Sequence, residues 1–139
     1  MNILLWTLQV LLAAQFLFHG WLFVSPPPEL APMISAAFPL WFRLFLGVAE
    51  LLAGVGLILP GVTRILPRLV PLAAVGIMIV TASATVFHAV RGEITSALTT
   101  AALFVMAAFV AYMRLRVRPI APRQSAGAVA GSRGDGAHG

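Results

Sequence analysis

The sequence contains no cysteine and no lysine, and charged residues occupy only 9% of its 139 positions. Without cysteine the chain cannot form a disulfide, a thiolate metal site or a redox thiol, so any electron chemistry has to come from a bound cofactor or a partner. Soluble domains usually carry about 25% charged residues. The shortage of charge therefore excludes an ordinary soluble enzyme, and the length is that of one domain.

Apolar residues are abundant where charge is scarce. They make up 60% of the chain, and the mean hydropathy is +0.99. A helix needs ~20 apolar residues to cross ~30 Å of hydrocarbon. Four segments approach that length, approximately residues 3–24, 39–59, 69–90 and 94–113. The sequence therefore predicts an all-α fold, an integral membrane four-helix bundle, in a domain covering residues 1–116.

Short polar links separate these segments. "SPPPELAP" cannot continue a helix, and "LPGVTRILPR" separates the second span from the third. "RGE" at 91–93 is so short that the third and fourth helices should be antiparallel neighbours. Residues 117–139 are rich in Gly, Ala, Pro and Arg and poor in large apolar residues, which predicts a disordered basic tail in the cytoplasm.

The nine arginines give a net charge of +5 and are distributed unevenly. Arg43 and Arg91 lie on one side of the predicted membrane. The other side carries Arg64, Arg68, Arg114, Arg116, Arg118, Arg123 and Arg133. The positive-inside rule then places both termini in the cytoplasm. Because the arginines adjoin apolar spans, we expect them to contact the lipid bilayer, and not nucleic acid.

One carboxylate, Glu50, lies near the middle of the second span, where a charge costs roughly 2.5–3.5 kcal/mol. Gly47 and Gly54 follow the same helical stripe as Glu50. Small residues let a neighbouring helix approach closely, so we expect Gly47 and Gly54 to be helix-packing residues. Glu50 should therefore face another helix.

Four other polar side chains lie at depths comparable with Glu50 or closer to the outer surface. At 1.5 Å per residue, Gln15 and Thr81 are nearly level with Glu50, whereas His19 and His88 lie further out. Side chains lean toward the N-terminus of their helix, which brings Glu50 and His19 toward each other. The candidates for ligand binding or proton handling are Glu50, His19, Gln15, His88 and Thr81. No catalytic residue or metal ligand is indicated.

Glu50 has two interpretations at this stage. Intramembrane acids commonly mark a functional site. The alternative is a protonated acid that bonds Gln15 or a backbone carbonyl and only holds the helices in register.

Three stretches resemble the DoxX-like family of small four-helix bacterial membrane proteins. They are "QFLFHGW", "GVAELLAGVGLILPG" and "PLAAVGIMIVTASATVFHAVRGE", within a resemblance that covers about residues 3–113. The more specific parts are Gly47-x-x-Glu50 followed by Pro60, and His88-x-x-x-Gly92-Glu93. Family members often carry a lysine a few residues after the glycine that matches Gly20, and here that region reads "WLF".

The resemblance implies a multi-pass protein of the bacterial inner membrane. The family takes its name from a subunit of a thiosulfate:quinone oxidoreductase, so a quinone cofactor and a redox partner protein are what the resemblance implies. Two functions follow as hypotheses. One is a membrane subunit of a quinone-linked oxidoreductase system, in which Glu50 handles the quinone or its proton. The other is a non-enzymatic assembly or small-molecule permeability component, in which Glu50 is structural. The substrate, the oligomeric state and whether the chain is an enzyme stay open.

Overall fold

The computed structural model describes residues 2–123, and within that range the chain is helical with no strand. Its elements are α1 (Asn2–Val24), α2 (Ala31–Ala37), α3 (Leu40–Thr63), α4 (Leu69–Val90), α5 (Ile94–Tyr112) and the π-helix η1 (Met113–Val117). Four helices are long and apolar enough to cross a membrane, the last being α5 continued by η1. The predicted all-α membrane bundle is confirmed.

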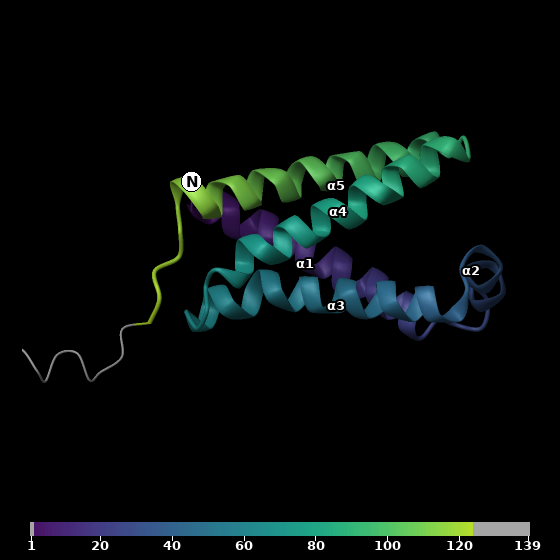
Figure 1. The fold of residues 1–139 in the computed structure, drawn as a ribbon, viewed down its shortest axis with the longest axis horizontal. Coiled ribbons are helices and arrows are strands. Elements are labelled where there is room, and N and C mark those ends of the chain that lie inside the picture. Colours follow the sequence, from purple (N-terminus) through teal and green to yellow (C-terminus); the bar gives the residue numbers. More distant parts are fainter. Residues whose placement is uncertain (1, 124–139) are drawn as a thin grey trace, which may run out of the picture.

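The long helices form two antiparallel hairpins, α1 with α3 and α4 with α5 (Figure 1). The hairpins meet at the end that holds the start of α1 and the end of α5, which we call the terminal end. They separate toward the end that carries α2 and the α4–α5 turn, which we call the loop end (Figure 1). This divergence leaves room for a cavity between the hairpins in the loop half of the bundle.

Helix limits follow largely from proline and glycine. Pro39 precedes α3 in an extended conformation, and Gly92 makes the α4–α5 turn with a φ of 73°, which costs glycine little. α3 continues through Pro60 to Thr63, beyond the end at residue 59 that the sequence suggested. A proline in the last turn removes only its own N–H bond, and neighbouring helices cover it here. The short helix α2 was not expected from the sequence.

The hydrophobic core lies in the terminal half. Its members come from the middle of α1, the first half of α4 and the second halves of α3 and α5: Leu12, Ala13, Phe16, Leu57, Ala74, Ile77, Ala107, Val110 and Ala111. In a bilayer the hydrophobic effect does not drive helices together, so close packing and interhelical hydrogen bonds have to supply the stability. The core closes the bundle at the terminal end.

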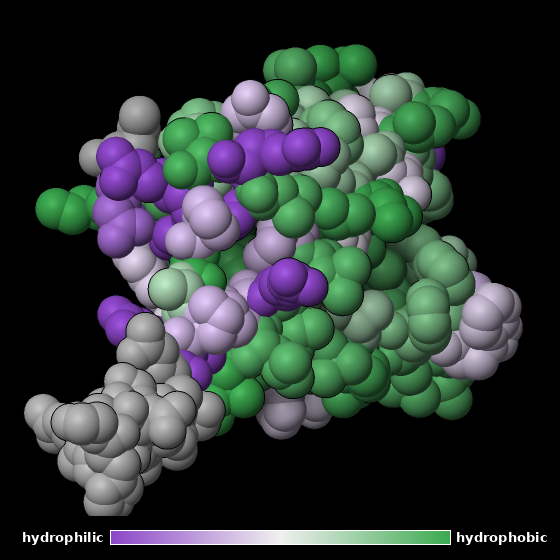
Figure 2. All heavy atoms as spheres, turned by 60° about the vertical axis from the view of Figure 1, so that its left-hand side comes forward, coloured by the Kyte–Doolittle hydropathy of each residue, from purple (hydrophilic) through white to green (hydrophobic). Residues whose placement is uncertain are grey.

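The outer surface is strongly apolar. Many large hydrophobic side chains are more than half exposed, among them Leu52, Val62 and Val105. Figure 2 shows hydrophobic residues over much of one face and hydrophilic residues gathered beside the segment drawn in grey. Apolar area of this extent requires lipid, so the chain is a multi-pass membrane protein.

The segment after η1 returns toward α3. The backbone N–H of Arg123 donates to the carbonyl oxygen of Arg64 at 3.0 Å. The disordered tail expected from residue 117 onward lies mostly outside the described residues, which end at Arg123.

Candidate functional site

A cavity of about 220 Å³ lies between the two hairpins in the loop half. All five candidate residues from the sequence contribute to its wall: Gln15, His19, Glu50, Thr81 and His88. The hydroxyl-bearing residues Thr95, Ser96, Thr99 and Thr100 of α5 line it too, and Phe16 and Leu103 are among the apolar residues in the wall. The structure therefore brings side chains from four helices to one space.

The central contact in this cavity joins α1 to α3. Nδ1 of His19 lies 2.7 Å from Oε2 of Glu50. Glu50 is 2% exposed, whereas the His19 side chain is 43% exposed. A hydrogen bond between an acid and an imidazole is strong when either partner is charged. Because Nδ1 of His19 is engaged, its other ring nitrogen, Nε2, is the one left for a ligand.

Two glycines allow this contact to form. A Cβ on Gly20 would lie 2.8 Å from the carbonyl oxygen of Gly47, and a Cβ on Gly47 would lie 2.9 Å from that of Gly20. Real Cβ atoms do not approach so closely, so the two backbones can touch only because both residues are glycine. Gly54 is also tight, 2.8 Å from Cγ of Leu17 by the same measure. The helices therefore cross closely beside the His19–Glu50 bond.

Thr81 and Gln15 line the cavity, and neither forms a hydrogen bond with Glu50. The Thr81 hydroxyl donates to the carbonyl oxygen of Ile77 in its own helix at 2.8 Å. Gln15 has an exposed side chain and forms no hydrogen bond within residues 2–123. The hydrogen-bond partner of Glu50 is thus His19. The structural alternative expected Gln15 or a backbone carbonyl in that place.

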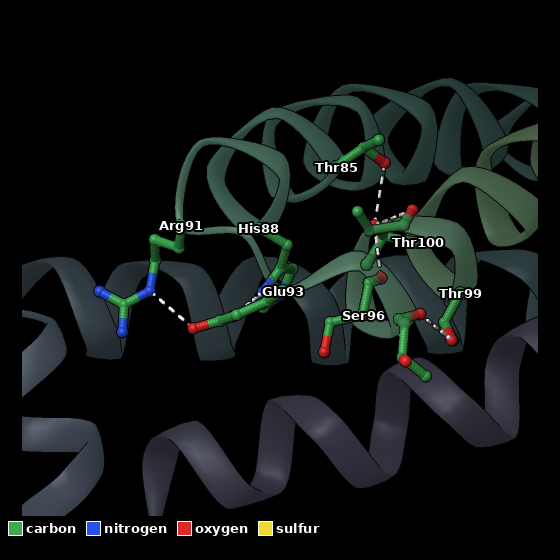
Figure 3. Close-up of polar contacts among 9 residues, drawn as sticks. Thr85, His88, Arg91, Glu93, Ser96, Thr99 and Thr100 are labelled. Carbon is green, nitrogen blue, oxygen red and sulfur yellow. Dashed lines mark hydrogen bonds and ion pairs between the residues drawn. The ribbon is translucent and has the colours of Figure 1, made fainter.

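A second acid–imidazole contact lies at the loop end. Nδ1 of His88 is 2.5 Å from Oε2 of Glu93, and Nε of Arg91 donates to Oε1 of Glu93 at 2.8 Å (Figure 3). These bonds, first to Arg91 and then to His88, lower the pKa of the Glu93 carboxyl below its usual value. The sequence placed Arg91 and Glu93 in one short link, but it did not reveal that His88 bonds the Glu93 carboxylate.

Hydroxyl groups connect α4 to α5 beside this pair. The Thr85 hydroxyl donates to the Thr100 hydroxyl at 2.9 Å, and Thr100 donates to the carbonyl oxygen of Ser96 at 3.0 Å (Figure 3). The hydroxyls of Thr95 and Ser96 have no partner in the described part of the chain. Hydroxyls both donate and accept, so this wall of the cavity can bind a polar group or water.

One buried polar network was missed by the sequence reasoning, which counted Arg114 only as a surface charge. Arg114 is 4% exposed; its Nε donates to Oε1 of Gln9 at 2.7 Å and its Nη1 to Oδ1 of Asn2 at 3.1 Å. The Gln9 amide donates to the carbonyl oxygen of Leu57 at 2.7 Å, and the guanidinium lies 5.3 Å from the Trp6 ring centroid. The signal available was Gln9, one of two glutamines in the first apolar span. This network fastens α1 to α3 and η1 at the terminal end.

The site shows no metal cluster: within residues 2–123, no three or more His, Asp or Glu side chains come close enough to hold an ion. The polar side chains of the cavity wall include the His19–Glu50 pair, His88, which bonds Glu93 beside the cavity, and a group of hydroxyls.

Fold and site together define a multi-pass helical membrane protein with a buried acid on the wall of a cavity between two hairpins. The model of the DoxX-like family matches residues 7–110, and the chain belongs to this family. The matched range includes both hairpins and every residue of the cavity wall. Comparison with curated proteins and with solved structures gave no match.

Proposed function

We propose that this DoxX-like protein binds a quinone-type ring compound in the cavity, as a membrane subunit of a quinone-linked oxidoreductase system. The observation that carries the proposal is the His19–Glu50 hydrogen bond. It places a nearly fully buried acid beside a half-exposed imidazole on the wall of a cavity of about 220 Å³. Intramembrane acids are costly, and they commonly mark ligand or proton sites.

The size and the lining of the cavity fit a ring with polar substituents. An apolar cavity of about 150 Å³ in another protein holds benzene, so about 220 Å³ accommodates a substituted ring. Apolar residues such as Phe16, Val80 and Leu103 supply contact area, and imidazole and hydroxyl groups supply a few directed hydrogen bonds. This combination is typical of cofactor sites.

The cavity also has a side that faces the bilayer. Gln15 on α1 and Thr95 and Thr99 on α5 line the cavity and yet have exposed side chains. α1 and α5 make few contacts and diverge toward the loop end (Figure 1). A gap between these two helices favours a ligand that enters from the lipid phase, as quinones do because of their apolar tails.

His19 and Glu50 have defined roles in this proposal. With Nδ1 held by Glu50, the imidazole presents Nε2 to the ligand. When the pair holds a second proton, Nε2 donates a hydrogen bond to a ligand carbonyl; when the pair has lost it, Nε2 accepts one from a ligand hydroxyl. A bound quinone supplies the redox chemistry, and a partner protein supplies the electrons. Glu50 orients the imidazole through the bond to Nδ1.

The test measures quinone binding to the protein in lipid nanodiscs. We expect Glu50→Gln and His19→Gln each to weaken the affinity about tenfold, the factor that corresponds to about 1.4 kcal/mol. Glu29→Gln, which changes an exposed acid in the α1–α2 link, should leave the affinity unchanged. Wild-type protein that retains and binds no quinone would refute the proposal.

One observation favours the structural alternative as a second candidate. The His19–Glu50 bond adjoins the Gly20–Gly47 contact, so it also clamps α1 to α3. If this were its only role, Glu50→Gln would retain function while Glu50→Leu would impair folding or association with a partner. Quinone would then bind to neither wild type nor variants.

A further inference from the structure

Two acid–imidazole pairs lie at the cavity: His19, Glu50 and His88 line its wall, and Glu93 bonds His88 from the adjoining turn. In each pair a histidine bonds through Nδ1 to a glutamate, which is Glu50 of α3 in one pair and Glu93 of the turn before α5 in the other. We call His19–Glu50 the inner pair and His88–Glu93 the outer pair. The Glu50 side chain is 3% exposed and the Glu93 side chain 38% exposed. The acid of the inner pair is therefore buried, whereas the acid of the outer pair is accessible at the loop end.

The outer pair lies at the loop end of the bundle, where the apolar helices α4 and α5 are joined. His88 lies in the last turn of α4, and Glu93 lies in the turn before α5, outside the apolar helices. At the opposite end the core, with Leu12, Leu57 and Ile77 fully buried, closes the bundle. Protons that reach the inner pair from water must therefore enter from the loop end.

The space between the pairs can conduct protons. A water molecule takes about 30 Å³ in the liquid, so a cavity of about 220 Å³ holds several. The hydroxyls of Thr95 and Ser96 line the same space and have no partner in the described residues. Water and hydroxyl groups donate and accept at once, which is the requirement for passing a proton along a chain.

We propose that the outer pair, His88–Glu93, is the proton-exchange group of the cavity. A proton from the aqueous phase at the loop end binds the outer pair and passes through cavity water and hydroxyls to the inner pair. The outer pair then takes up another proton from water, and release follows the same route in reverse. No electron is transferred in these steps.

The charges around the outer pair suit this role. Arg91 holds Oε1 of Glu93, so the carboxylate keeps Oε2 on Nδ1 of His88 and leaves Nε2 of that ring to exchange protons. His88 shares the wall of the cavity with His19 on α1 and Glu50 on α3. The inference rests on the proposed function only where it treats the inner pair as a proton-handling group.

The experiment follows protonation of Glu50 after a pH jump, without quinone, so that a failure of quinone binding does not affect it. The full chain in lipid nanodiscs is monitored by infrared spectroscopy, and the Glu50 bands are assigned by their loss in Glu50→Gln. We expect His88→Gln and Glu93→Gln to slow the Glu50 response about tenfold or more without reducing its final amplitude. Glu29→Gln should respond like wild type.

A chemical rescue separates proton transfer from a structural role. Free imidazole in the buffer should restore the rate in His88→Gln, because a small proton donor can replace the missing ring, whereas a misfolded variant would not recover. Unchanged rates in both outer-pair variants would overturn the proposal, and so would a slowed rate that imidazole fails to restore.

The side of access can be tested separately because the chain has no cysteine. In proteoliposomes, Ser96→Cys in the cavity wall should react with a membrane-impermeant thiol reagent added at the loop end. Ala107→Cys in the core should not react from either side. Reaction of Ser96→Cys only from the terminal end would contradict entry at the loop end.

Discussion

Gly20 and Gly47 bring the backbones of α1 and α3 into direct contact, because a side chain on either residue would meet the carbonyl oxygen of the other within 3 Å. His19 and Glu50 adjoin this crossing and form their 2.7 Å hydrogen bond there. The close approach of the helices and the polar contact thus depend on each other. A wider crossing would separate the imidazole from the acid.

Adding a methyl group at this crossing should destabilise the bundle. We expect Gly20→Ala and Gly47→Ala each to lower the free energy of unfolding by about 1–3 kcal/mol, the usual cost of overpacking. The loss is measured by comparing the unfolding of wild type and variants in mild detergent. Gly76→Ala in α4 is the matched control: a Cβ there meets nothing within 4 Å, and we expect stability to be unchanged or slightly higher. Equal stability of Gly20→Ala and Gly76→Ala would contradict this account.

The network at the terminal end should be important for stability. Gln9→Leu removes the acceptor for Nε of Arg114 and leaves a buried guanidinium N–H unpaired. A hydrogen bond to a charged group contributes about 1.5–3 kcal/mol, so we expect a loss of that size in the free energy of unfolding. Gln15→Leu is the same substitution at an exposed position and should cost little. A larger loss for Gln15→Leu than for Gln9→Leu would show that the network is unimportant.

Glu93 should make stability depend on acid pH. Its pKa is lowered from 4.5 in the folded protein by Arg91 and His88. Its stabilising contribution is thus fully present above pH 4.5 and disappears as the pH falls through the lower folded pKa. The melting temperature of wild type should exceed that of Glu93→Gln at neutral pH, and the difference should vanish in strong acid. If the difference in melting temperature between wild type and Glu93→Gln increased on acidification, the pH dependence would be opposite to the expected one and the interpretation would be rejected.

The orientation of the chain in the membrane is a further prediction. The described arginines at the terminal end include Arg64, Arg116 and Arg118, and no described acid lies there, whereas Glu29 and Glu93 lie toward the loop end. The positive-inside rule then places the terminal end in the cytoplasm. In intact cells an impermeant thiol reagent should label Ser35→Cys and spare Arg118→Cys. The opposite pattern would invert the topology.

The sequence predicted the fold class and the family because both depend on local properties. Hydropathy over about twenty residues indicates a membrane span whatever its neighbours are. The pattern was less informative near proline, where it ended a span at residue 59 while α3 runs on to Thr63. Covering by adjacent helices decides whether a proline ends a helix, and a linear pattern does not contain that information.

The site was predictable in part. The depth argument placed Gln15 and Thr81 level with Glu50, and the lean of the side chains brought His19 toward it; all four residues line one cavity. The bonding among them was not predictable, since Thr81 bonds its own helix and Gln15 does not bond Glu50. Two side chains on different helices can form a hydrogen bond only when each helix is rotated about its axis so that they face each other. The depth of a residue in the membrane does not determine that rotation.

The sequence by itself determined that this is a membrane protein with four apolar spans, a buried acid and an excess of arginine near the terminal end. The tertiary structure decided the partners. It joined Glu50 to His19 across 31 residues and Arg114 to Gln9 across 105 residues, and it placed His88, which bonds Glu93, on the wall of the cavity that holds Glu50. The physical reason is that composition sets which solvent a helix prefers, whereas crossing geometry and close backbone approach set which side chains meet.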